Sequence, residues 1–197
     1  MCKKEEKNLW ADVMVVTNRR LSVRPFLEQV ERICRHRPAG IILREKDLPE
    51  KEYEKLAAEV REICQSCQVL LVYHSFIRAA RRSGIRAIHL PLAALEESPA
   101  GELAREFAVL GVSVHSREEA CRAEALGATY LTAGHVYATD CKKGLPPRGT
   151  DFLREVCGAV HIPVFGIGGI RLEQTQIEEV KSCGAAGACV MSAAMEL

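Results

Sequence analysis

Eight short apolar segments, rich in residues that favour strands, recur along the chain and limit its possible folds more than any other feature. They span residues 13–16, 40–43, 69–72, 87–90, 111–114, 130–133, 164–167 and 188–191. Their hydrophobicity is nearly continuous rather than alternating, which is typical of strands buried on both faces of a parallel sheet. We therefore expect eight strands in a parallel sheet.

Amphipathic helical segments lie between most of these strands. They are predicted over residues 25–35, 50–63, 117–126 and 172–183, and Ser116 has the position of a capping residue before the third. Strands that alternate with helices in this number predict a single (β/α)8 barrel domain over residues 1–197. An open doubly wound sheet would carry a glycine fingerprint after its first strand, and the segment 17–20 (Thr-Asn-Arg-Arg) is not one.

Charge and cysteine content exclude several classes of function. With 27 basic and 26 acidic side chains, the net charge is +1, so we expect no nucleic-acid partner. No apolar run reaches the ~18 residues of a membrane span, and the charged start of the chain does not resemble a signal peptide. Nine scattered cysteines, with one CxxC pair at Cys64 and Cys67, do not form a secreted disulfide framework. These features predict a cytoplasmic protein without a membrane partner.

Polar residues gather where the predicted strands end, which is the edge of a (β/α)8 barrel that carries its chemistry. Gly168 and Gly169 follow the seventh strand, and Met191 and Ser192 end the eighth. The loops after these two strands are the common phosphate site of the fold, because glycines let backbone N–H groups approach phosphate oxygens. The alternative is that the glycines only permit a tight turn.

Other strand ends carry basic side chains. Arg44 and Lys46 are two residues apart, so both should point into the barrel mouth and favour an anionic ligand, unless they are simply a solvated strand end. His135 opens a long loop that also contains Lys143 and could act as a partial lid over the mouth. Histidines titrate near neutral pH, which makes His135 the candidate general acid/base, although many such histidines are structural. Ser113 and His115, at the end of the fifth strand, complete the predicted ligand-binding set.

We expect no metal site. His74, His89 and His115 also lie at strand ends, but no carboxylates accompany them there. His89 lies inside a predicted strand, so it is interpreted as a hydrogen-bonded residue of the barrel interior. The CxxC pair lies at the end of a helical run without a second pair, which argues against zinc or redox chemistry.

Several short motifs are spread over almost the full chain, namely the segments 16–19 (VTNR), 43–46 (LREK), 111–115 (GVSVH), 127–130 (GATY), 166–170 (GIGGI), 184–187 (GAAG) and 190–193 (VMSA). Together these motifs resemble the thiamine phosphate synthase superfamily. The run from Gly134 to Leu145, GHVYATDCKKGL, is similar to the signature loop of the thiazole tautomerase branch. The synthases hold a magnesium ion with two aspartates after strands 3 and 4, and this chain has Ser75 and Ala93 at those positions.

The resemblance therefore implies a thiazole tautomerase, an isomerase of thiamine biosynthesis that needs no metal or other cofactor. Its substrate would be a small thiazole phosphate carboxylate, with the ylidene tautomer converted to the aromatic one. His135 would move the protons, Gly168, Gly169 and Ser192 would bind the phosphate, and Arg44, Lys46 and Lys143 would face the carboxylate. Two alternatives stay open: a magnesium-dependent thiamine phosphate synthase, and a non-catalytic regulatory protein that binds the thiazole phosphate.

The end of the chain carries a prediction about assembly. Only six residues follow Met191, too few for the usual last helix of about 10 residues, so the barrel is expected to have a truncated or missing final helix. Apolar side chains of the first and last strands, such as Val13 and Val190, would then be left open. An exposed apolar patch is typical of an interface, so we expect a homodimer, or a plug formed by Leu9 and Trp10.

Overall fold

The computed structural model describes residues 8–99, 101–139, 142 and 144–197. Eight parallel strands form a closed barrel in sequence order, with β1 hydrogen-bonded to both β2 and β8. The strands are β1 (Val13–Val16), β2 (Gly40–Leu43), β3 (Leu71–His74), β4 (Ala87–Pro91), β5 (Val109–Val114), β6 (Tyr130–Gly134), β7 (Val164–Ile167) and β8 (Gly187–Val190). The predicted (β/α)8 barrel is confirmed.

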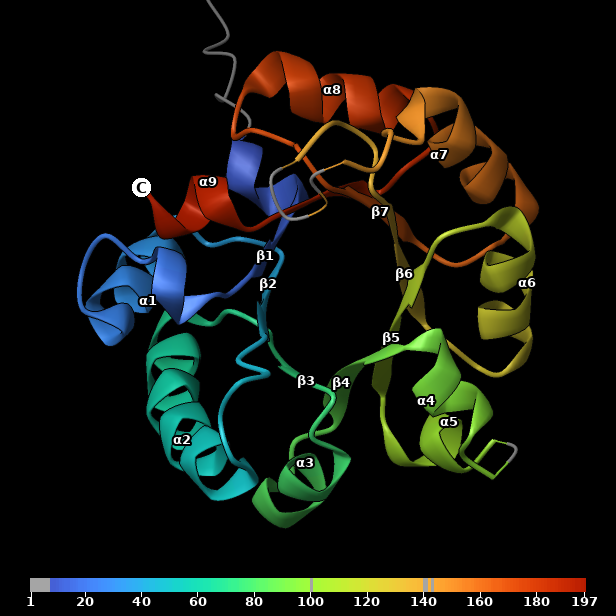
Figure 1. Cartoon of the computed structure of the whole chain (residues 1–197). Helices are drawn as coiled ribbons and strands as arrows, with labels where there is room; N and C mark the ends of the chain where they lie inside the picture. Colours follow the sequence, from blue (N-terminus) through green and yellow to red (C-terminus); the bar gives the residue numbers. More distant parts are fainter. Residues whose placement is uncertain (1–7, 100, 140–141, 143) are drawn as a thin grey trace, which may run out of the picture.

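Helices form a ring outside the barrel (Figure 1). They are α1 (Phe26–Arg35), α2 (Glu50–Cys67), α3 (Ile77–Ser83), α4 (Leu92–Glu96), α5 (Glu102–Glu106), α6 (Arg117–Ala125), α7 (Gly149–Ala159), α8 (Gln174–Ser182) and α9 (Ser192–Met195), with 3₁₀ turns η1 (Leu9–Asp12) and η2 (Arg19–Leu21). Ser116 caps α6 as predicted, because its side chain accepts a hydrogen bond from the Glu119 amide. No helix of the described residues is long and apolar enough to cross a membrane.

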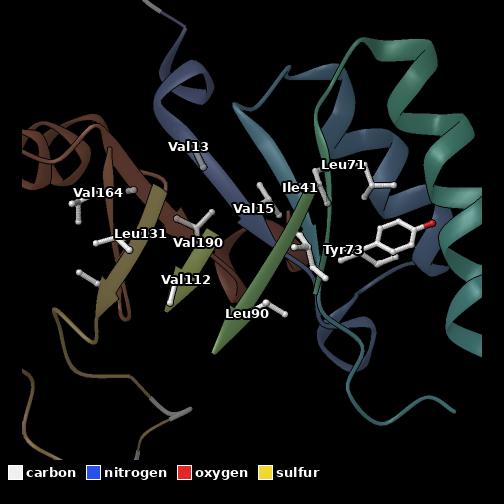
Figure 2. Close-up of a cluster of buried hydrophobic side chains, with 14 of the residues drawn as sticks. Val13, Val15, Ile41, Leu71, Tyr73, Leu90, Val112, Leu131, Val164 and Val190 are labelled. Atoms are coloured by element: carbon white, nitrogen blue, oxygen red, sulfur yellow. The ribbon is translucent and has the colours of Figure 1, made fainter. Parts of the chain in front are cut away.

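Alternate residues of each strand face two different cores. Val13, Val15 and Val190 belong to the larger core, which lies between the sheet and the helices (Figure 2). Met14, Val16, Ile42, Val72, Tyr130 and Cys189 fill the barrel interior below the mouth. Burial on both faces explains why the strands read as continuous apolar runs in the sequence.

Strand β3 begins two residues later than the sequence predicts. Gln68 has left-handed backbone angles (φ 58°) and ends α2, and the Val69 amide donates to the carbonyl of Cys64. Val69 therefore belongs to the end of the helix. The cysteines of the CxxC pair, Cys64 and Cys67, lie in the last turn of that helix, and every described cysteine is a free thiol.

The expected gap at the end of the barrel is closed. The short helix α9 follows β8, with Ala194 and Met195 fully buried, and the Gln29 side chain of α1 donates to the Ala194 carbonyl at 2.7 Å. Val13 and Val190 are consequently 0% and 2% exposed rather than open. The expectation of an uncovered apolar surface was wrong. The four residues of α9 are enough to cover the first and last strands, because the Gln29 side chain of α1 holds them in place. The homodimer stays an untested prediction, and the exposed apolar patch from which it was inferred is absent from the described residues.

The 3₁₀ turn before β1 packs against the barrel, in agreement with the predicted plug formed by Leu9 and Trp10. Trp10, in η1, is 9% exposed, and its ring stacks on His36 at 4.7 Å between centroids. It belongs to the same outer core as Val13 and Val190.

Candidate functional site

A cavity of about 580 Å³ opens at the carboxyl ends of the strands. Side chains from nearly every strand end line it, as the fold requires of a site built on loops around a rigid barrel. The lining includes every predicted site residue that the structure describes, namely Arg44, Lys46, Ser113, His115, His135, Gly168, Gly169, Met191 and Ser192. Lys143 lies outside the described residues.

The end of β2 presents two cations to the cavity. Arg44 and Lys46 both line it, while Glu45 between them is buried at 2% exposure and faces away. Glu45 accepts hydrogen bonds from the Thr17 hydroxyl at 2.7 Å and from Arg19. Arg44 and Lys46 have no carboxylate partner among the described residues, so their charges are available to a ligand. Loss of hydration, and then the neighbouring charge of Arg44, lower the pKa of Lys46.

The loops after β6 and β7 are joined by backbone hydrogen bonds. The amides of Val136 and Tyr137 donate to the carbonyls of Ile167 and Gly168, both at 2.9 Å. A Cβ on Gly168 would lie 2.3 Å from the Cβ of His135, and Gly168 has a φ of +103°. The close approach of the two loops therefore requires a glycine at position 168. This bears out the alternative that the glycine permits a tight turn, and it leaves room for a further role toward a ligand.

The backbone of His135 forms a shorter hydrogen bond than its imidazole ring does, because the Arg148 amide donates to the His135 carbonyl at 3.0 Å. The His135 side chain is 6% exposed, and Nε2 lies 3.4 Å from the Leu145 carbonyl oxygen, a long hydrogen bond. Nδ1 is buried and has no hydrogen-bond partner among the described residues. His115, by contrast, donates from Nδ1 to the Gly134 carbonyl at 2.9 Å.

Free backbone donors accompany the glycines. Within the described chain, the amides of Gly168, Gly169 and Ile170 have no acceptor, nor do those of Ser192 and Ala193 after β8. Gly168, Gly169, Ile170 and Ser192 line the cavity. Such donors at the ends of β7 and β8 suit the oxygens of a phosphate group.

Two buried histidines lie on the opposite wall. His89 is 2% exposed and hydrogen-bonded at both ring nitrogens, to Tyr130 and Ser113, which agrees with its sequence interpretation as a barrel histidine. His74 stacks beside it at 5.7 Å between ring centroids. Burial is the main cause that lowers the pKa of His74 to about 2 and that of His89 to about 3, so both rings are neutral at physiological pH.

The site residues named from the sequence do not include several residues that line the cavity. Lys142, beside the predicted Lys143, supplies a third cation to the lining, and Thr132, Thr139 and Asn18 supply polar atoms. The position of Lys142 in the loop after β6 was a usable signal, since that loop was expected to cover the mouth. Thr132 gave none, because a threonine inside a strand reads as an ordinary strand residue.

Fold and cavity together define a (β/α)8-barrel protein with basic side chains and free backbone amides around a cavity at its strand ends. The chain belongs to the thiamine monophosphate synthase family, whose model matches residues 13–194. Thiamine-phosphate synthase of Pyrococcus horikoshii is 36% identical over 184 residues, which are 92% of this chain and 85% of that protein. Thiamine-phosphate synthase 2 of Streptococcus pneumoniae is 33% identical over 183 residues, 92% of this chain and 86% of that protein.

A solved structure agrees with these relatives. The thiamine phosphate pyrophosphorylase of Pyrococcus furiosus superimposes with a TM-score of 0.79 at 30% sequence identity, covering 95% of this chain and 89% of that one. The superfamily resemblance read from the motifs is thereby confirmed.

The expected activity is corrected by the same comparisons. Relatives that span most of the chain are named thiamine-phosphate synthase, a transferase, and not an isomerase. The tautomerase interpretation depended on one loop and two substituted positions, whereas the similarity to synthases extends over the whole barrel. The alternative weighed from the sequence, a thiamine-phosphate synthase, is the better supported one.

The magnesium ion implied by the synthase resemblance does not fit the residues present. Magnesium requires oxygen ligands that usually include carboxylates. No Asp or Glu is among the described residues that line the cavity, and the nearby carboxylate of Glu45 is engaged by Thr17 and Arg19. Ser75 and Ala93, at the aspartate positions of the resemblance, have exposed side chains without a carboxylate. Nor do His, Cys, Asp and Glu side chains form a metal-binding group of three anywhere in the described ranges.

Proposed function

We propose that the chain is a thiamine-phosphate synthase that binds its anionic substrates with protein cations and amides. In the proposed reaction a thiazole phosphate and a pyrimidine pyrophosphate combine to give thiamine phosphate and pyrophosphate. The thiazole ring nitrogen bonds to the methylene carbon of the pyrimidine, and the C–O bond to pyrophosphate breaks with its electron pair leaving on oxygen. The observation that carries the proposal is the set of cavity cations without a carboxylate partner among the described residues, in a chain whose relatives over 92% of its length are named thiamine-phosphate synthase.

Arg44, Lys46 and Lys142 are proposed to receive the pyrophosphate group. All three line the cavity, and none forms an ion pair with another described residue. A leaving pyrophosphate gathers negative charge as its bond breaks, so fixed cations stabilise the transition state more than the substrate. In this proposal they do the work that a carboxylate-held metal would otherwise do.

The amides of Gly168, Gly169 and Ile170, with Ser192, are proposed to bind the phosphate of the thiazole. These donors are fixed by the backbone before a ligand arrives, which reduces the entropy lost on binding. Met191, His115 and Ser113 would contact the rest of the bound molecules.

His135 loses its proposed acid/base role with the isomerisation. The transfer written above removes no proton from carbon, so a proton carrier is not needed. His135 is instead proposed as the support of the loop after β7, because its Cβ lies where a side chain on Gly168 would be.

The test is product formation by the purified full-length chain. Thiamine phosphate and pyrophosphate are quantified after incubation with both substrates, with magnesium and, separately, with EDTA. We expect turnover in both conditions, and kcat/KM about 10- to 100-fold lower for Arg44→Ala, the effect of losing a charge-assisted hydrogen bond. Arg35→Ala, an exposed residue of α1 paired with Glu31, serves as the control and should be unchanged. Failure of the wild-type chain to form thiamine phosphate would contradict the proposal.

A binding protein without turnover is the second candidate. The observation that favours it is the lack of any carboxylate among the described residues of the cavity wall. Tight binding of the thiazole phosphate, with no product in the assay above, would support it.

The proposed setting is the cytoplasm, and the homodimer also stands as a proposal. All described cysteines are free thiols, and the buried Sγ atoms of Cys34 and Cys64 lie 3.9 Å apart in a hydrogen-bond contact rather than a disulfide, which suits a reducing compartment. Light scattering at micromolar concentration tests the dimer.

A further inference from the structure

Three neighbouring strands bring a tyrosine, a glycine and a histidine into one row inside the barrel. The register places His89 of β4 beside Gly111 of β5, and Gly111 beside Tyr130 of β6 (strands in Figure 1). A Cβ on Gly111 would lie 2.4 Å from His89 Nδ1 and 2.1 Å from Tyr130 Cζ. The absence of a side chain at Gly111 therefore lets His89 and Tyr130 meet across the middle strand.

A chain of hydrogen bonds runs from this row to the cavity. The Tyr130 hydroxyl lies 2.9 Å from His89 Nδ1, and His89 Nε2 lies 2.8 Å from Ser113 Oγ. The Thr132 hydroxyl donates to Ser113 Oγ at 3.2 Å, and its Oγ1 also lies 3.4 Å from His89 Nε2, farther than Ser113 Oγ does. Tyr130, His89 and Thr132 are buried, whereas Ser113 is half-buried and lines the cavity.

The protonation states of Tyr130 and His89 determine which atom donates in each of these hydrogen bonds. Burial raises the pKa of the Tyr130 phenol well above its usual value and lowers the pKa of His89 to about 3, so the phenol keeps its proton and the imidazole carries one. The Tyr130 hydroxyl has no other acceptor among the described residues, and leaving a buried O–H unpaired costs free energy. The phenol therefore donates to Nδ1, which leaves the only imidazole proton on Nε2, and Nε2–H donates to Ser113.

Ser113 Oγ then accepts two hydrogen bonds, one from His89 and one from Thr132. A serine hydroxyl has one proton, and neither of these neighbours can accept it in this arrangement. The proton is free for an acceptor in the cavity that Ser113 lines.

We infer that Tyr130 and His89 are positioning residues that set Ser113 as a hydrogen-bond donor into the cavity, so that the site selects a ligand with an acceptor atom there. The tautomer part of this inference concerns the ligand-free protein and is independent of the reaction. The ligand part rests on the proposed function, because the ligand that tests it is the proposed product.

The tautomer of His89 is the direct test. Two-bond ¹H–¹⁵N correlation spectra of the ligand-free protein, with His89 assigned by comparison with His89→Gln, distinguish Nε2–H from Nδ1–H. We expect Nε2–H in the wild-type chain and a mixture of both tautomers in Tyr130→Phe. An Nδ1–H tautomer or an imidazolium in the wild-type chain at neutral pH would overturn the inference, whether or not the chain makes thiamine phosphate.

A double-mutant cycle tests the connection to the ligand. Titration calorimetry with thiamine phosphate should give a Kd about 3- to 10-fold weaker for Tyr130→Phe, the effect of one misdirected hydrogen bond. In a Ser113→Ala background the same substitution should have no further effect, because no hydroxyl remains to be directed. Tyr73→Phe removes another buried tyrosine hydroxyl, on the outer face of β3, and should leave the Kd unchanged. An undiminished effect of Tyr130→Phe in the Ser113→Ala background would show a merely structural role and refute the inference.

Discussion

Replacing Gly168 by alanine should disrupt the contact between the loops after β6 and β7. The new methyl group would lie 2.3 Å from His135 Cβ and 2.8 Å from His135 Cα, and the residue would keep a φ of +103°. The backbone conformation costs an alanine roughly 1–2 kcal/mol, and inserting a methyl group into packed surroundings costs about 1–3 kcal/mol more. We therefore expect the free energy of unfolding to fall by about 2–5 kcal/mol.

Thermal and urea unfolding measure this loss. For a domain of this size, 1 kcal/mol corresponds to roughly 2–4 °C, so Tm should fall by about 4–20 °C with an unchanged urea m-value. Phosphate binding should weaken in the same variant, because the Gly168 amide moves with its loop.

Gly84→Ala is the matched control. Gly84 also has a positive φ, +69°, but a Cβ there would have nothing within 4 Å. It should show only the conformational part, about 1–2 kcal/mol, and no change in phosphate binding. If the two variants are equally destabilised, the close approach of Gly168 and His135 does not contribute as argued.

Three further predictions concern pH and charge. Because Lys46 has a lowered pKa, phosphate affinity measured by calorimetry should fall as pH rises into the alkaline range, and Lys46→Arg should remove that fall; an identical profile in both proteins would contradict the role of Lys46. His74 and His89 have folded pKa values of about 2 and 3 against an ordinary 6.5, so the unfolded chain alone takes up protons as pH falls. Full stability should hold above pH ~6.5 and decline below it, by up to about 2 kcal/mol per histidine at pH ~5; urea melts of His89→Gln should show a smaller decline, whereas His161→Gln, at a 98% exposed side chain, should match the wild type. Restoring aspartate at both Ser75 and Ala93 should create Mg²⁺ affinity detectable by calorimetry, because carboxylates would then flank the mouth, and equal Mg²⁺ binding by the unmodified chain would refute our account of these positions.

The strands were predictable because their burial on both faces leaves a direct mark on the sequence. Four residues such as Val13 to Val16 are all apolar when one pair faces the helices and the other faces the barrel interior. The closure at α9 was not predictable, because it depends on the Gln29 side chain of α1 reaching Ala194, 165 residues away in the chain. Contacts of this kind are set by the tertiary structure and leave no local periodicity.

The position of the cavity was predictable, but the hydrogen bonds between the residues of its wall were not. Strand ends identify the barrel mouth, so Arg44, Lys46 and Gly168 were found from the sequence. The hydrogen bonds of Tyr130 and His89 were not, because they depend on the register of three strands and on the space beside Gly111.

The activity was the weakest inference. A signature loop and two missing aspartates suggested an isomerase, yet relatives that match 92% of the chain are named thiamine-phosphate synthase. Which bond a pocket breaks depends on the placement of a few charges around the substrate, and a local motif does not fix that placement.

The central claim is that this cavity catalyses formation of thiamine phosphate with release of pyrophosphate. Phosphorus NMR follows it directly: the full-length chain is mixed with the pyrimidine pyrophosphate, with and without the thiazole phosphate, and the two diphosphate signals are recorded over time. Our account predicts that the paired signals of the ester convert to the single signal of free pyrophosphate only when the thiazole phosphate is present, in step with thiamine phosphate. An unchanged diphosphate ester in the complete mixture, under conditions where the thiazole phosphate is shown to bind, would contradict the account.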